Sequence, residues 1–194
     1  MMKEFAEVNV KTQATMEGVD FTSSGELAQA NRGDALAAPA FTEISHWQLA
    51  HEEAVEYWLT EYQPQLNANN LEKVQGYLEA FYHYCELKNW QKASEIISIR
   101  LDTPTNEALG DQLGTWGYYR QQIELFNKLL SKLNAPWDMI CWQRMGNAYD
   151  SLAEYRQAMR CQHKSLVIAR EIGDRNGEGS GLGSLGNAYY SLGE

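Results

Sequence analysis

The sequence has few cysteines, few basic residues and no long apolar run, and each shortage argues against a class of protein. The three cysteines, Cys85, Cys141 and Cys161, are widely spaced and form no C-x-x-C pair. This usage is typical of buried thiols in a reducing compartment rather than of a disulfide framework or a zinc site, so we expect a cytoplasmic protein. The sequence also lacks an apolar run long enough to span a bilayer.

Basic residues are outnumbered by acidic ones, 16 to 26, which gives a net charge of −10. Binding to the phosphates of nucleic acid requires clustered lysine and arginine, and adhesion to an anionic membrane surface requires the same. We therefore expect neither nucleic acid nor a membrane as a partner. Apolar residues make up 44% of the 194 residues, which is enough for a sizeable folded core.

The chain divides into three stretches by pattern. Residues 1–40 are rich in alanine, glycine, serine and threonine without a sustained apolar period, which predicts a flexible segment. From Phe41 the apolar residues follow the helical period. Over 41–70 we expect a helical cap or a divergent repeat that begins at an N-cap, Thr42. Helices and short turns alternate over 71–194, no stretch reads as a strand, and the predicted fold is all-α, in antiparallel helical hairpins.

The segment WQRMGNAYDSLAE, 142–154, aligns with LGSLGNAYYSLGE, 182–194, and seven of the thirteen positions are identical. This repeat explains GLGSLG, 181–186, which matches the glycine fingerprint of a dinucleotide site. Gly186 corresponds to Gly146, which has no G-x-G before it. A dinucleotide site also needs a strand before its glycine turn, and none is predicted. We therefore expect these glycines to lie within a helix, with no nucleotide bound.

The repeat resembles the tetratricopeptide repeat (TPR), whose pattern is W-x2-L-G-x2-Y followed by A-x3-F. The positions that carry the resemblance are Trp142, Met145, Gly146, Tyr149, Tyr155 and Ala158, then Leu182, Leu185, Gly186 and Tyr189. Gln162 stands where the pattern has an aromatic residue. Two weaker copies lie upstream. In one, Gly110 and Phe126 fit the pattern; in the other, Phe81 stands where the pattern has the small glycine. The resemblance implies a superhelical solenoid over about 71–194.

The 40-residue spacing is longer than a plain TPR. It resembles the long-repeat subclass found in large bacterial signalling proteins, beside NTPase or protease-like domains, and in animal spindle-orientation adaptors. The last copy has only its first helix. Either the chain is a piece of a longer array, or it ends in an open apolar edge suited to self-association or to a partner.

The resemblance also implies a concave groove lined by the first helix of each hairpin. The residues expected there are Asp111, Gln143, Asn147, Asp150, Asn187 and Tyr190. Asn147 and Asn187 match the asparagine that hydrogen-bonds a peptide ligand in the family, and the alternative is a local structural asparagine within G-N-A-Y. Gln143 and Gly183 stand one turn before the two asparagines, and neither is a cation, so a clamp for a C-terminal carboxylate is not expected. Acidic groove residues favour basic or amphipathic ligands.

No catalytic set emerges from the sequence. His46 and His51 lack H-E-x-x-H spacing, and no nucleophile with a base, paired carboxylates or metal-ligand cluster can be nominated. We therefore expect no enzyme, metal or cofactor, but a scaffold that binds a protein or peptide in its groove. The alternative is a sensor or oligomerisation arm of a larger signalling NTPase or protease.

Overall fold

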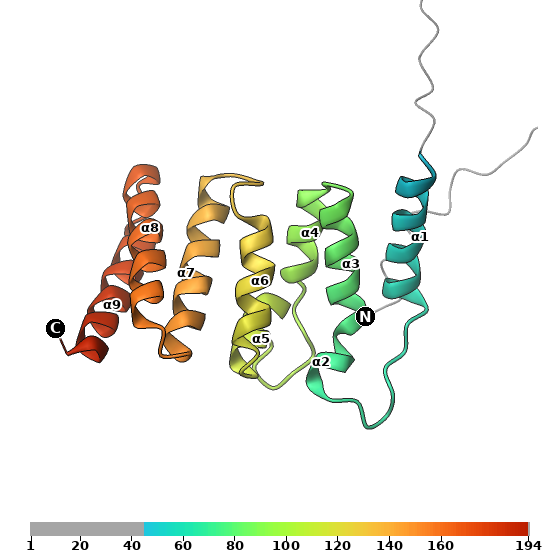
Figure 1. The fold of residues 1–194 in the computed structure, drawn as a ribbon, viewed down its shortest axis with the longest axis horizontal. Coiled ribbons are helices and arrows are strands. Elements are labelled where there is room, and N and C mark those ends of the chain that lie inside the picture. Colours follow the sequence, from blue (N-terminus) through green and yellow to red (C-terminus); the bar gives the residue numbers. More distant parts are fainter. Residues whose placement is uncertain (1–44, 194) are drawn as a thin grey trace, which may run out of the picture. The chain divides into compact units, whose positions relative to one another are not determined.

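The computed structural model describes residues 45–193, and the regular elements of this part of the chain are all helices (Figure 1). The predicted flexible segment 1–40 and the predicted N-cap Thr42 lie outside it. The helices are α1 (His46–Thr60), α2 (Asn70–Lys73), α3 (Gln75–Glu86), α4 (Trp90–Ile97), α5 (Leu109–Thr115), α6 (Tyr119–Leu129), α7 (Ala135–Ser151), α8 (Tyr155–Ile172) and α9 (Arg175–Leu192). The all-α prediction is confirmed for these residues.

The first helix, α1, packs against α3 at very short range. Ser45 caps α1 by accepting a hydrogen bond from Gln48 N. A Cβ added at Gly76 of α3 would lie 2.5 Å from the carbonyl oxygen of Trp58. The absence of a side chain at Gly76 therefore sets how closely α3 approaches the backbone of α1.

Two helices, α2 and α3, occupy a stretch, 71–88, whose apolar spacing is that of one continuous helix. Asn69 and Glu72 form a reciprocal capping box at the start of α2. Val74, with φ −104° and ψ 5°, then leaves the helical conformation and α3 starts afresh at Gln75. The apolar spacing continues across this break, so periodicity alone did not show it.

Three helical hairpins follow, α3–α4, α5–α6 and α7–α8, and their turns have the same backbone geometry. In each turn a residue with positive φ stands two positions before the second helix: Lys88 (φ 55°), Gly117 (φ 84°) and Ala153 (φ 58°). The next N–H in each turn donates to a carbonyl five residues back, a bond typical of the Schellman motif. These bonds are Asn89 N to Tyr84 O, Tyr118 N to Leu113 O and Glu154 N to Tyr149 O, at 2.8–2.9 Å.

Two of the hairpins also share a packing register. A Cβ at Gly110 would lie 2.9 Å from Phe126 Cζ, and one at Gly146 would lie 2.5 Å from Gln162 Nε2. The glycine and its neighbour are sixteen residues apart in both cases. The two helices of the α7–α8 hairpin therefore approach closely at Gly146, and the side chain that fills the space is Gln162.

The last described helix, α9, packs against α8 and α7. It contains all of GLGSLG, 181–186, so these glycines are helix interior, as predicted, and no strand precedes them in the described chain. Gly186 differs from Gly146 in having open space beside it, with no atom within 4 Å of an added Cβ. Among residues 45–193, no helix is both long and apolar enough to cross a membrane.

Candidate protein-interaction surface

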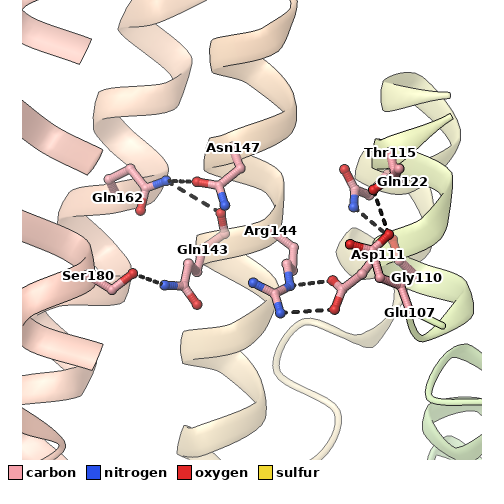
Figure 2. A network of polar contacts seen from close by, with 10 residues as sticks. All are labelled: Glu107, Gly110, Asp111, Thr115, Gln122, Gln143, Arg144, Asn147, Gln162 and Ser180. Carbon is pink, nitrogen blue, oxygen red and sulfur yellow. Dashed lines mark hydrogen bonds and ion pairs between the residues drawn. The ribbon is translucent and has the colours of Figure 1, made fainter. Parts of the chain in front are cut away.

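The predicted groove residues lie on α5, α7 and α9, and we call these six residues the first-helix face, because each was predicted to lie on the first helix of a hairpin. Its members are Asp111, Gln143, Asn147, Asp150, Asn187 and Tyr190. Helix α7 supplies the central three, which fall on one stripe because positions 143, 147 and 150 are spaced by four and three. Figure 2 shows the polar contacts that tie α7 to its neighbours.

Asp111 of α5 is engaged by a cation from α7 rather than left open. Arg144 Nη2 donates to Asp111 Oδ2 at 3.0 Å, and Arg144 Nε lies 2.5 Å from Asp111 Oδ1. Each side chain keeps about a third of its surface exposed, 34% and 33%. This ion pair, with a single hydrogen bond from Nη2, neutralises Asp111, so the expectation of an acidic groove is corrected at this position. The sequence reasoning missed Arg144 because its partner is 33 residues away.

Gln143 also has a partner within the chain. Its Nε2 donates to Ser180 Oγ at 2.5 Å, which joins α7 to α9 across the first-helix face (Figure 2). Gln143 and Arg144 are adjacent in sequence, yet they reach the helices on opposite sides of α7. Together they join α5, α7 and α9, and a bound segment would have to displace Gln143 from Ser180 to use this N–H group.

Asn147 uses one of its two polar groups in a hydrogen bond within the chain. Its Oδ1 accepts a hydrogen bond of 2.8 Å from Gln162 Nε2, which also approaches Gln143 O at 3.4 Å. The acceptor of Asn147 therefore has the local structural role that we kept as an alternative. Its Nδ2 forms no hydrogen bond with any described residue, and the side chain is exposed. This donor is available to a ligand.

Gln162 is a buried polar residue whose structural role the sequence did not predict. It is only 2% exposed and lies against Gly146, while its Oε1 has no hydrogen-bond partner among the described residues. A buried amide of this kind is held by the partners that it does have, since unmade hydrogen bonds are costly in the interior. Gln162 therefore couples the hairpin contact at Gly146 to the orientation of Asn147.

The remaining part of the face, on α7 and α9, is open. Tyr190 is 86% exposed and Asn187 is also exposed, and neither forms a hydrogen bond with a described residue. Asp150 is partly buried, and its Oδ1 is buried without a hydrogen-bond partner in the described chain. Of the six predicted residues, Asp111 and Gln143 join the helices, and Asn147, Asn187 and Tyr190 retain exposed groups that can contact a ligand. The unpartnered Oδ1 of Asp150 is buried and is not accessible to a ligand.

The cysteines show no sign of chemical activation. All three are buried, and burial raises the pKa of Cys85 and Cys161 to about 11 and that of Cys141 to about 12. Such thiols stay protonated near neutral pH, whereas nucleophilic cysteines have a lowered pKa. Within residues 45–193, no three histidine, cysteine or acidic side chains are grouped to hold a metal ion.

No family model matches the chain. Over 52 residues it is 42% identical to the human protein G-protein-signaling modulator 1. The match covers 27% of this chain and 8% of the relative, so the chain spans only a small part of the relative's length.

Proposed function

We propose that the chain is a TPR-like solenoid that binds a protein or peptide segment along its first-helix face and carries out no catalysis itself. The repeated hairpin turn and the shared register of Gly110 and Gly146 support a true structural repeat. Stacked repeats of this kind present an extended surface formed by equivalent helices, which suits a linear ligand. The likeness to a signalling modulator favours a role in signalling or protein interaction.

The observation that carries the proposal is the set of unused polar groups on α7 and α9. Asn147 Nδ2 on α7 is a free donor, and the exposed amide of Asn187 on α9 forms no hydrogen bond with any described residue. An extended peptide presents carbonyl oxygens and N–H groups in alternation, so this pair complements a peptide backbone. The exposed ring of Tyr190 adds an apolar contact beside them.

Asn187 and Tyr190 give the sharpest test, because neither has a hydrogen bond within the described chain to lose. Peptides selected from a displayed library of linear sequences against the full chain provide the probe. Binding of a selected peptide, measured by fluorescence anisotropy, should weaken about tenfold or more in the Asn187→Ala/Tyr190→Ala variant, a loss of roughly 1.4 kcal/mol.

Asn127→Ala is the matched control, since Asn127 is an exposed asparagine on α6, a second helix. It should leave peptide affinity unchanged, and circular dichroism should show equal helicity in all variants. Peptides that bind the double variant as tightly as the parent chain would place binding elsewhere and refute the assignment.

The second candidate is an arm of a larger signalling protein. It is favoured by one observation: the relative is far longer than the matched segment, which makes up 8% of it. In that case ligand binding on the same face would control a domain elsewhere in the protein. A change of peptide affinity caused by nucleotide, in a protein that carries an adjoining NTPase domain, would distinguish this role from that of an independent scaffold.

A further inference from the structure

Helix α9 carries an apolar strip that no other described helix covers. Leu182 is 49% exposed and Tyr189 is 40% exposed. The equivalent residues of α7, Trp142 and Tyr149, are partly buried against the core. Gly186, with open space beside it, lies next to this strip, whereas the equivalent Gly146 is covered by Gln162. The strip lies on a different side of α9 from Asn187, so it is separate from the first-helix face.

The neighbouring side of α8 is basic. Arg156, Arg160 and His163 are exposed there, at spacings of four and three that place them on one stripe. Arg156 and Arg160 form no ion pair with any residue in 45–193. A hollow of about 640 Å³ is lined in part by Arg160, His163, Leu185 and Tyr189. We call the basic stripe together with Leu182 and Tyr189 the α8–α9 dock.

A surface of complementary character lies on α1, on the side away from α3. Leu49 is 45% exposed and Tyr57 is 52% exposed, and Glu53 and Glu56 are exposed between them. The spacing of 49, 53, 56 and 57 puts the four side chains on one helix face, which we call the acidic face of α1. Its two glutamates form no ion pair with a described residue.

We propose that copies of this chain associate head to tail, with the acidic face of α1 of one copy seated in the α8–α9 dock of the next. Leu49 and Tyr57 would cover Leu182 and Tyr189, and the glutamates would approach the free arginines. Two chains of net charge −10 repel each other over most of their surface, so a local basic stripe is the element that favours this one orientation.

The two surfaces are different, so the contact is heterologous. Such contacts form a ring if the rotation between copies closes, and an open chain of copies if it does not. Neither surface includes a residue of the first-helix face, so the proposal does not require that face to bind a peptide.

The experiment uses two variants, each blocked on one side. Leu49→Ser/Tyr57→Ser blocks α1, and Leu182→Ser/Tyr189→Ser blocks the dock; all four side chains are exposed in the single chain, so the fold should persist. By sedimentation equilibrium, the mass of the parent chain should rise above 22.1 kDa over roughly a hundredfold increase in concentration. Each blocked variant alone should stay at the mass of one chain.

Mixing the two blocked variants is the decisive step, because each retains the half that the other lacks. The mixture should form a dimer and nothing larger, and added salt should weaken it. Leu66→Ser is the control, since Leu66 is fully exposed outside both surfaces and its loss should leave the self-association of the parent chain unchanged.

Three results would overturn the proposal. The first is a parent chain that stays monomeric throughout the concentration range. The second is a blocked variant that self-associates like the parent, or a mixture that stays monomeric. The third is that a peptide of residues 154–173, the sequence of α8, binds the dock while the parent chain does not associate. That result would mean that the dock receives the second helix of a repeat rather than α1 of another copy.

Discussion

Gly146 and Gly186 occupy the same position in two copies of the repeat, but their surroundings predict opposite effects of the same mutation. Alanine at Gly146 puts a Cβ 2.5 Å from Gln162 Nε2 and 2.8 Å from its Cδ. Gln162 is 2% exposed, so it has little space to retreat into. Alanine at Gly186 meets nothing within 4 Å. We therefore expect Gly146→Ala to destabilise the chain and Gly186→Ala to stabilise it.

The magnitudes follow from two opposing terms. Glycine in a helix interior costs roughly 1 kcal/mol relative to alanine, and both variants recover this. Overpacking of a close contact costs about 1–3 kcal/mol, and displacing Gln162 from Asn147 adds about 1 kcal/mol for the lost hydrogen bond. The net loss at Gly146 is then about 1–3 kcal/mol, against a gain of roughly 0.5–1 kcal/mol at Gly186.

Thermal and urea denaturation of the full chain, followed by circular dichroism, would measure both effects. A chain of this size should shift by about 2–4 °C in Tm for each kcal/mol. Gln162→Ala in the Gly146→Ala background should recover part of the loss, because it removes the colliding group. Equal stabilisation by both glycine replacements would refute the close contact in the α7–α8 hairpin.

Two further predictions concern the junction of α1 and α3. Gly76→Ala should cost about 1–3 kcal/mol, since its Cβ meets a backbone carbonyl of α1 at 2.5 Å, and urea denaturation would measure the loss; an unchanged midpoint would contradict the packing. The second concerns His51 and His83, whose Nδ1 atoms lie 2.8 Å apart. Burial first and His51 second lower the pKa of His83, although Glu79 and Glu86 oppose this shift. Since the pKa of His83 is lower in the folded chain, the unfolded chain binds more protons below about pH 6.5, and Tm should fall as pH drops through that value. The fall should be smaller in the His83→Gln variant. An equal fall in Tm for the parent chain and the variant would exclude the His51–His83 pair as the cause.

Helix content and hairpin pairing were predictable from the sequence, because apolar spacing and turn residues are local signals. The break at Val74 was not, since apolar residues continue on the same stripe through it. A signal was nevertheless present: Asn69 and Glu72 have the spacing of a capping box, which marks a helix start. Residue spacing shows which side of a helix is apolar, whereas capping pairs show where the helix begins.

The candidate site was predictable only in part. The helical period places Asn147 and Asp150 on one stripe, but it does not say which helix faces that stripe. The ion pair of Arg144 with Asp111 depends on how the fold places α5 beside α7. The two residues are 33 positions apart in the sequence, so no local pattern predicts that they meet. Gln162 departed from the family pattern, and its role became clear only with Gly146 and Asn147 beside it.

The repeated hairpin turn has a consequence for how such a chain diverges. Lys88, Gly117 and Ala153 are chemically unrelated, yet each takes the left-handed conformation at the same place. That conformation costs a residue with a side chain about 1–2 kcal/mol. The turns at Lys88 and Ala153 keep it because the packing of the flanking helices holds the backbone in place. The amino-acid sequence of such a turn can therefore change while its backbone conformation stays the same. Gly193 (φ 78°), which matches Ala153 in the next copy, has the same conformation. Gly173 (φ 73°) has it as well, between α8 and α9, so this backbone geometry joins successive helices in this chain both within a hairpin and between hairpins.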